Sequence, residues 1–350
     1  MFQPDYRNIV DSAWNRECKR IPLYEHNVDI RKIGEILDVD MGSLHNGNEE
    51  DLHEFFRLYC NFFRDNGYDV VTFERGVAEI MPNGGSLLNS HITPAIQTRE
   101  EFDAYPWDEI PDKFFEQYSK YYRVLREEMP EGMMAIGGVG YGIFECVQNV
   151  TGYEGLCYIS ADDEELYEEL FQKVGEIYYQ IWQRFMKEFG DIYCVLRFGD
   201  DLGYKSNTLL STADIKNLIC PQYKRVVDLV HSYDKPFLLH SCGNIFGIMD
   251  ELIEEVGINA KHSNEDQIAP FSEWVERYGD KIGNFGGVDV DVICSASKGE
   301  LRAYIINIIE KCKNQGGFAI GTGNSIPTYV PAEKYLDMID IVRECRGDYN

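Results

Sequence analysis

Helical and extended segments alternate along most of the chain, and this alternation limits the fold more than any other feature. Amphipathic stretches with apolar residues at helical spacing end at Gly, Asp or Pro, and a short apolar run follows each of them. Strands that alternate with helices form parallel sheets, and seven or eight such units are typical of a (β/α)8 barrel. We therefore predict an α/β fold of the (β/α)8 TIM-barrel class. The predicted strands are 68–73, 133–138, 193–198, 237–239, 259–262, 281–286 and 318–321, with the eighth at 77–81 or elsewhere in the chain.

The sequence shows no clear domain boundary. No linker, low-complexity tract or block of charge divides the sequence, which predicts a single domain. Residues 1–66 are expected to form an N-terminal cap region of that domain, and residues 67–350 the barrel. The cap region contains a short extended piece at 20–26 and an amphipathic helix at 49–66. A longer helix is predicted to start at a Ser160 cap and to run to Phe189.

The charge of the chain excludes some classes of partner. There are 60 acidic and 33 basic residues, so the net charge is −27, and no Lys/Arg cluster interrupts the excess of acid. Nucleic acids and anionic membranes both attract a basic surface, so neither is expected as a partner. The sequence shows no apolar run of membrane-spanning length and no secretory leader, which predicts a cytoplasmic protein with reduced cysteines.

The apolar run at 237–239 leads into His240 and Cys242, which we take as the centre of the chemistry. In a strand, residues two apart point to the same face. An imidazole and a thiolate that leave the end of one strand together could supply two ligands of a zinc site. On its own the His-x-Cys pattern is a weak signal, because most buried His and Cys residues are packing residues.

Other polar residues follow the predicted strands, at the ends where TIM barrels carry their functional groups. A metal site or an acid/base site is therefore expected at this side of the sheet. Asp residues after strands also cap the helices that follow, and capping is an equal alternative for Asp200 and Asp289. His262 is expected in the barrel wall, and His26 is expected to be structural. The residues after the strands are Asp200, Asp201, His240, Cys242, Glu265, Asp266, Asp289 and Asn324.

Four motifs together indicate a family. They are 199–203 (GDDLG), 236–244 (PFLLHSCGN), 278–289 (YGDKI leading to GGVD) and 316–331 (GGF leading to IP and VP). With these motifs the chain resembles the uroporphyrinogen decarboxylase superfamily of (β/α)8 barrels over most of residues 130–345. The resemblance implies the same fold for this chain.

The superfamily contains two chemistries that differ at residues visible here. True uroporphyrinogen decarboxylases form one branch of the superfamily that this chain resembles. They use no metal and bind the carboxylates of their substrate through an N-terminal Arg-Gln-Ala-Gly-Arg segment. In this chain 20–26 reads RIPLYEH, which offers an acidic residue instead. The cobamide-dependent methyltransferases bind zinc through His-x-Cys and a distant Cys, and His240 and Cys242 match the first two ligands. Asn324 stands where the distant Cys is expected, so the third ligand differs.

The resemblance therefore implies a zinc-dependent methyltransferase that moves a methyl group between a corrinoid protein and a small thiol, pterin or methoxylated substrate. Zinc is expected on His240, Cys242 and Glu265, and the corrinoid is expected on a partner protein. Two alternatives stay open: a metal-free decarboxylase, and a non-catalytic partner of a corrinoid protein. The sequence also leaves open whether the chain forms a homodimer. The residues expected to orient the substrate or the metal ligands are Asp201, Asp289 and Asn324.

Overall fold

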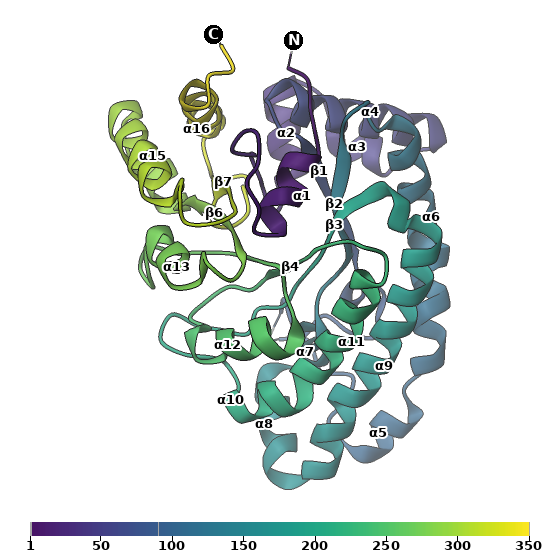
Figure 1. Ribbon diagram of the computed structural model, residues 1–350. Helices are drawn as coiled ribbons and strands as arrows, with labels where there is room; N and C mark the ends of the chain where they lie inside the picture. The colour runs from purple at the N-terminus through teal and green to yellow at the C-terminus, as the bar shows by residue number, and fades with distance from the viewer. Residues whose placement is uncertain (1, 90, 350) are drawn as a thin grey trace.

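The computed structural model describes residues 2–89 and 91–349, and its centre is a curled parallel sheet (Figure 1). The seven strands are hydrogen-bonded in sequence order and every neighbouring pair is parallel. The seven predicted strands and the TIM-barrel-like α/β architecture are thereby confirmed. The strands are β1 (Val70–Gly76), β2 (Met134–Gly140), β3 (Tyr193–Gly199), β4 (Phe237–His240), β5 (Ala260–His262), β6 (Gly283–Val288) and β7 (Phe318–Thr322).

Helices cover the outer face of this sheet. Figure 1 shows α6, α9 and α11 along one side of the molecule, with α13, α15 and α16 on the other. The helices are α1 (Arg7–Ala13), α2 (Ile30–Leu37), α3 (Met41–His45), α4 (Glu49–Asp65), α5 (Arg99–Ala104), α6 (Ile110–Glu128), α7 (Ile143–Thr151), α8 (Tyr153–Asp162), α9 (Glu164–Phe189), α10 (Thr212–Asp214), α11 (Cys220–His231), α12 (Met249–Glu251), α13 (Phe271–Tyr278), α14 (Val290–Ser295), α15 (Lys298–Cys312) and α16 (Ala332–Cys345). The shorter turns of helix are η2 (Trp107–Glu109), η3 (Gly190–Ile192), η4 (Ile215–Ile219), η5 (Phe246–Ile248) and η6 (Leu252–Val256).

The start of α9 differs from the prediction. Ser160 lies inside α8, where its hydroxyl donates to the carbonyl of Cys157 at 2.8 Å. Asp163 leaves the helical conformation (φ −146°, ψ 81°), and its carboxylate accepts from the N–H of Leu166. A carboxylate at a helix start both caps a free N–H group and complements the helix dipole, so the chain breaks at Asp163 and not at Ser160.

The eighth strand proposed at 77–81 is wrong. This segment contains a 3-10 turn, η1 (Ala78–Ile80), directly after β1. Ala and Glu are poor strand formers, and Pro82, which follows, lacks the N–H group that a ladder needs. A short apolar run was therefore not enough to extend the sheet.

The N-terminal segment 22–28 lies beside β7 instead. Leu23 forms a parallel bridge with Ile320, and Val28 forms one with Ile326. This segment belongs to the predicted cap region, yet it extends the wall of the sheet by one short piece. Within residues 2–89 and 91–349, no strand pairing joins it to β1.

The inside of the curled sheet is filled by apolar side chains. Each of the seven strands contributes at least one of them, and α1 and the 22–28 segment add the others. Helix α1 contacts β3, β6 and β7 and so blocks the amino-terminal end of the sheet. The opposite end, where the strands finish, is left for a site. The buried residues of this inner core are Ile9, Ala13, Tyr24, Val70, Ile136, Cys194, Val195, Leu238, Ala260, Phe285 and Ala319.

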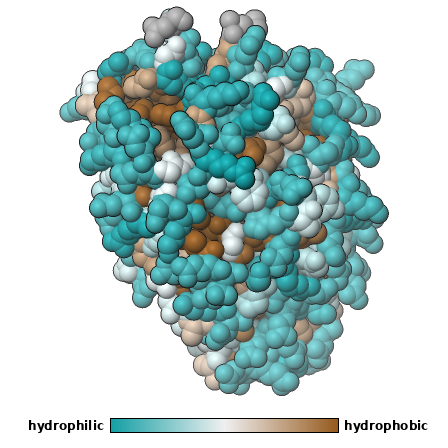
Figure 2. All heavy atoms as spheres, viewed as in Figure 1, coloured by the Kyte–Doolittle hydropathy of each residue, from teal (hydrophilic) through white to brown (hydrophobic). Residues whose placement is uncertain are grey.

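The surface in view is mainly hydrophilic. Figure 2 shows hydrophilic residues over most of this face, with hydrophobic residues in smaller areas among them. Among the described helices, none combines the length and the apolar character that a membrane crossing requires.

A buried acid in the 22–28 segment makes stability depend on pH. Burial raises the pKa of Glu25 to about 7, although Thr322 and Tyr68 donate hydrogen bonds to its carboxylate. The folded chain then keeps a proton that the unfolded chain releases near its ordinary value of 4.5. The stabilisation is complete below that value and is lost as the pH rises through 7.

We expect Glu25→Gln to flatten this dependence, because the amide imitates the protonated acid. Between pH 5 and pH 7 the slope of unfolding free energy against pH should fall by up to about 1.4 kcal/mol per pH unit. Urea unfolding at several pH values measures it. Burial also raises the pKa of Asp200 to about 7, so part of the wild-type slope should persist in the variant. Identical slopes in both proteins would show that Glu25 is not protonated in the fold.

Candidate metal and substrate site

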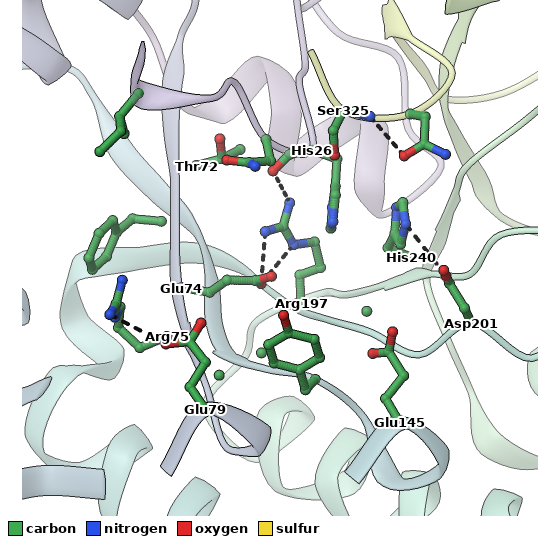
Figure 3. Close-up of a pocket in the computed structure, with 18 of the residues that line it drawn as sticks. His26, Thr72, Glu74, Arg75, Glu79, Glu145, Arg197, Asp201, His240 and Ser325 are labelled. Carbon is green, nitrogen blue, oxygen red and sulfur yellow. Dashed lines mark hydrogen bonds and ion pairs between the residues drawn. The ribbon is translucent and has the colours of Figure 1, made fainter. Parts of the chain in front are cut away.

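A cavity of about 520 Å³ lies at the carboxyl ends of the strands (Figure 3). Its wall includes residues at the ends of β1, β2, β3 and β4 and in the turn after β7. Helices α3, α4 and α7 supply the remaining side. The cavity is therefore where the fold predicts a functional site. The charged and polar residues on its wall include His26, Thr72, Glu74, Arg75, Glu79, Glu145, Arg197, Asp201, His240, Cys242 and Asn324.

Three potential metal ligands meet at one end of this cavity. The Sγ atom of Cys242 lies 3.4 Å from Nε2 of His240, and Oδ1 of Asp201 lies 3.8 Å from the same nitrogen. Strand β4 ends at His240, and the backbone N–H of Cys242 donates to Oδ1 of Asp201 at 2.9 Å. Imidazole, thiolate and carboxylate from two neighbouring strand ends thus face the same point.

The two loops that carry these residues touch each other at glycines. A Cβ atom on Gly243, which has a φ of +83°, would lie 2.2 Å from the backbone of Gly203. The N–H of Asn244 donates to the carbonyl of Tyr204 at 2.7 Å. Only glycine permits this backbone conformation and this approach without strain. The contact fixes the loop after β3 against the loop after β4, and so sets the position of Asp201 relative to Cys242.

Hydrogen bonds define which nitrogen of His240 faces the cavity. Nε2 of His262 lies 3.0 Å from the carbonyl oxygen of Thr322, which can only accept, so this nitrogen carries the hydrogen. Nδ1 of neutral His262 then accepts from Nδ1 of His240 at 2.7 Å. Burial lowers the pKa of both imidazoles, to about 3 for His262, so both stay neutral. His240 therefore presents a free lone pair on Nε2, as metal ligation requires.

A second group of three ligands, His26, His240 and His262, also lies close together. Here the two Nδ1 atoms are at hydrogen-bonding distance, and the ring of His26 stacks on that of His240 with centroids 3.6 Å apart. A tetrahedral zinc ion with ligand bonds of 2.0–2.3 Å separates its ligand atoms by roughly 3.3–3.8 Å. The distances around His240 Nε2 fit this spacing, whereas the 2.7 Å contact does not. The Asp201, His240 and Cys242 group is the better metal site.

The thiol of Cys242 needs a positive neighbour to ionise. Burial and the carboxylate of Asp201 raise its pKa, so the free thiol is neutral at pH 7. Nδ2 of Asn324 donates to Sγ at 3.4 Å, and the hydroxyl of Ser263 donates to it at 3.6 Å. Both hydrogen bonds favour the thiolate, and a cation at this point would complete its stabilisation.

Two predicted residues lie outside this group. Asp289 caps α14 by accepting from the N–H of Asp291 at 2.8 Å and that of Val292 at 3.4 Å. Glu265 belongs to neither ligand group within the described parts of the chain, although it follows β5 as expected. Asp200 is also engaged elsewhere, because it accepts from backbone N–H groups at the start of α7. Of the predicted site residues, the structure brings together Asp201, His240, Cys242 and Asn324.

Several residues of the site were not predicted. We expected His26 to be structural and His262 to lie in the wall, yet both contact His240. Glu74 and Glu145 are also absent from the predicted set, although Glu74 lies near the carboxyl end of β1, the end where TIM barrels carry their functional groups. Arg197 lies inside an otherwise apolar strand, where a charged residue is rare, and this position was the clearest sequence signal for a further site residue.

The contact between the two imidazoles gives a testable expectation. Replacing His262 with Leu removes the acceptor for Nδ1 of His240 and should weaken metal binding about 10- to 100-fold. His262→Asn keeps an acceptor near that position and should restore part of the affinity. Competition with a zinc chelator measures both, and circular dichroism checks the fold. Equal affinities in wild type and His262→Leu would rule out an orienting role.

Comparison with known protein families gives one match. The model of the family described as Uroporphyrinogen decarboxylase (URO-D) matches residues 80–345. A search of the curated proteins found no significant match.

Two solved structures share the fold. A methyltransferase from Methanosarcina mazei is similar with a TM-score of 0.71 and 13% identity, over 97% of this chain and 98% of that chain. A Listeria monocytogenes protein described as a candidate vitamin-B12-independent methionine synthase has a TM-score of 0.53 and 12% identity, over 99% and 98% of the two chains. At these identities the likeness concerns the fold alone.

Proposed function

The chain belongs to the uroporphyrinogen decarboxylase (URO-D) family, and we propose that it is a zinc-dependent methyltransferase. The proposed reaction moves a methyl group between a corrinoid protein and a small substrate bound in the cavity. One observation carries the proposal: Asp201, His240 and Cys242 present an oxygen, a nitrogen and a sulfur atom at zinc-like spacing on the cavity wall. Asp201 takes the place that we expected for Glu265.

Zinc, when bound, supplies a Lewis acid that lowers the pKa of a substrate thiol or polarises another heteroatom. The residues of the chain prepare the place where this happens. His262 holds Nε2 of His240 unprotonated, and the hydrogen bond from Asn324 stabilises negative charge on Cys242. His26 packs flat on His240 and limits its rotation. The side chain of His240 is only 6% exposed, which strengthens its interactions with His26 and His262.

The charges around the cavity argue against decarboxylation of a substrate with many carboxylates. Such a substrate needs several free cations. Both guanidinium groups on the wall are already paired, Arg197 with Glu74 at 2.7 Å and Arg75 with Glu79 at 3.3 Å. The carboxylates on the wall outnumber them. A metal-free decarboxylase is therefore the weaker candidate.

The similar structures point in the same direction without deciding the methyl donor. The Methanosarcina mazei protein is named as a methyltransferase, whereas the name of the Listeria monocytogenes protein states independence of vitamin B12. The corrinoid is thus the component of the proposal that most needs a direct assay.

The assay incubates the purified protein with methylcobalamin and a panel of thiol and pterin acceptors. We expect the spectrum of methylcobalamin to change to that of the demethylated form with at least one acceptor. A parallel arm supplies a methylated pterin in place of methylcobalamin. Transfer in this arm alone would retain the methyltransferase and remove the corrinoid.

Absence of methyl transfer in both arms would contradict the proposal. Release of carbon dioxide from a carboxylated tetrapyrrole would then support the decarboxylase. Binding of a methylated corrinoid protein without turnover would instead support the non-catalytic partner.

A further inference from the structure

The middle of the cavity carries more negative charge than its cations can balance. Glu74 and Glu79 come from the end of β1 and from η1, and Glu145 comes from the first turn of α7. Figure 3 shows Glu74, Glu79 and Glu145 in the same part of the cavity, with Glu145 nearest to Asp201 in this view. A set of acidic residues is not a site by itself, so the partners of each one matter.

Each of the two arginines of the wall is paired with a carboxylate. Arg197 donates to Glu74 through Nε at 3.1 Å and uses Nη1 for Tyr24 and the carbonyl of His26, both at 2.8 Å. Arg75 pairs with Glu79, and its guanidinium lies over the rings of two tyrosines at 4.6 Å and 5.2 Å from their centroids. Neither guanidinium forms an ion pair with Glu145.

Glu145 is the carboxylate that remains. In the described part of the chain no Lys, Arg or His nitrogen lies within 4.0 Å of it. Burial and the nearby Asp200 and Asp201 raise its pKa well above its ordinary value. Such a shift indicates a place that lacks positive charge. With the Asp201, His240 and Cys242 group reserved for a metal, Glu145 is the cavity carboxyl that has no cation beside it, and it therefore tends to keep its proton.

A second observation also points to a ligand. Thr72 is 4% exposed and belongs to the cavity wall. Its hydroxyl has no hydrogen-bond partner among the residues with described positions. Nδ1 of His26 and Nε of Arg75, on the same wall, are likewise buried without a protein partner there. Buried polar atoms are usually paired, so unpaired ones that face a cavity indicate a missing partner.

Aromatic rings complete this part of the wall. Phe55, Tyr59, Phe73 and Tyr141 all line the cavity. The ring of Tyr141 would meet a Cβ atom on Gly76 at 2.1 Å, so it lies against the end of β1, near Glu79. Aromatic faces attract cations, and they bind quaternary ammonium groups in particular.

We propose that the cavity binds a small organic cation, with an ammonium group beside Glu145 and its apolar part against the aromatic wall. The hydroxyl of Thr72 supplies a hydrogen bond to a polar group of this molecule. The claim that this cation is a substrate of methyl transfer rests on the proposed function. The claim that the cavity binds the cation does not, because binding requires no turnover. The single positive charge of the ligand would favour the ionised form of Glu145, whose proton is then released to solvent.

The test compares choline with 3,3-dimethylbutan-1-ol, a neutral molecule of nearly the same shape. A quaternary ammonium group cannot ligate a metal, so a difference between the two reports on charge at the cavity. We expect calorimetry on the whole protein to show choline binding at least 10-fold more tightly. Equal affinities, or tighter binding of the neutral alcohol, would overturn the inference.

A pair of variants locates the effect. Glu145→Gln should reduce the affinity for choline at least 10-fold and leave that for the alcohol unchanged. Glu276→Gln removes the same charge from the exposed surface of α13 and should change neither. Unchanged choline binding in Glu145→Gln would place the cation elsewhere and contradict the inference. If Glu145→Gln does not fold, the wild-type comparison still decides whether the cavity prefers the cation.

Failure here and failure of the proposed function are distinguishable. Choline binding through Glu145 without any methyl transfer would preserve the inference and remove the methyltransferase. Methyl transfer to or from a neutral substrate, without choline binding, would do the reverse.

Discussion

Exchanging Cys242 for serine is expected to lower the methyl-transfer rate by a factor on the order of 100 or more. Loss of a residue that only orients metal ligands usually costs 10- to 100-fold, and under the proposed function Cys242 would supply a ligand atom itself. Serine keeps the size of the side chain but not the soft sulfur that zinc prefers. His240→Ala should have an equal effect, because Nε2 lies 3.4 Å from that sulfur. Initial rates with methylcobalamin measure both.

A matched control separates the site from general loss of a thiol. Cys157 is exposed in α8, away from the cavity wall, and Cys157→Ser should leave the rate within about twofold of wild type because it removes no ligand. Full activity in Cys242→Ser would contradict a role for the sulfur in the reaction.

The second large effect concerns stability. Arg197→Met is expected to reduce the free energy of unfolding by about 3–5 kcal/mol, since it leaves a partner of a buried ion pair unpaired. The side chain of Arg197 is only 2% exposed, and it holds Glu74, the hydroxyl of Tyr24 and the carbonyl of His26. All three would lose a charged donor in one step. Urea unfolding monitored by circular dichroism provides the measurement.

The control is an arginine in an ordinary surface pair. Arg225 contacts Glu176 at 2.8 Å, and the two side chains are 39% and 49% exposed. Arg225→Met should cost no more than about 1 kcal/mol, because exposed ion pairs contribute little. Equal losses in Arg197→Met and Arg225→Met would mean that the buried network does not stabilise the fold.

Most of the fold could be predicted because its signals are local. Most of the seven strands are short, largely apolar runs set off by Gly, Asp or Pro, and all seven were predicted, although β5 (Ala260–His262) carries Lys261 and His262. The wall segment at 22–28 could not be recognised in the same way. Its bridges to Ile320 and Ile326 span about 300 residues of chain, and nothing in its own sequence names that partner.

The candidate site could also be predicted only as far as local patterns reach. His240 and Cys242 are two residues apart, so strand geometry alone placed them together. Asp201 and Asn324 follow other strands. Because the carboxyl ends of parallel strands lie on one side of the sheet, they could be predicted to belong to the same site. Their actual distances depend on close loop contacts such as that between Gly203 and Gly243, which no local pattern contains.

Residues that act through other residues were the hardest to predict. His262 lies within β5 and contacts the cavity only by way of His240, so its position in a strand indicated packing. His26 precedes the barrel strands and reaches the site through the pairing with β7. In each case the decisive fact is a tertiary contact that the sequence does not encode locally.

The central claim is that Asp201, His240 and Cys242 bind zinc, and the most direct measurement is the metal content of the purified protein. Elemental analysis is performed on wild type, Cys242→Ser and Cys157→Ser, prepared without chelators and without oxygen. We predict about one zinc ion per chain in wild type and in Cys157→Ser, and a loss of most of it in Cys242→Ser. Absence of metal from the wild-type protein, or full retention in Cys242→Ser, would contradict the claim.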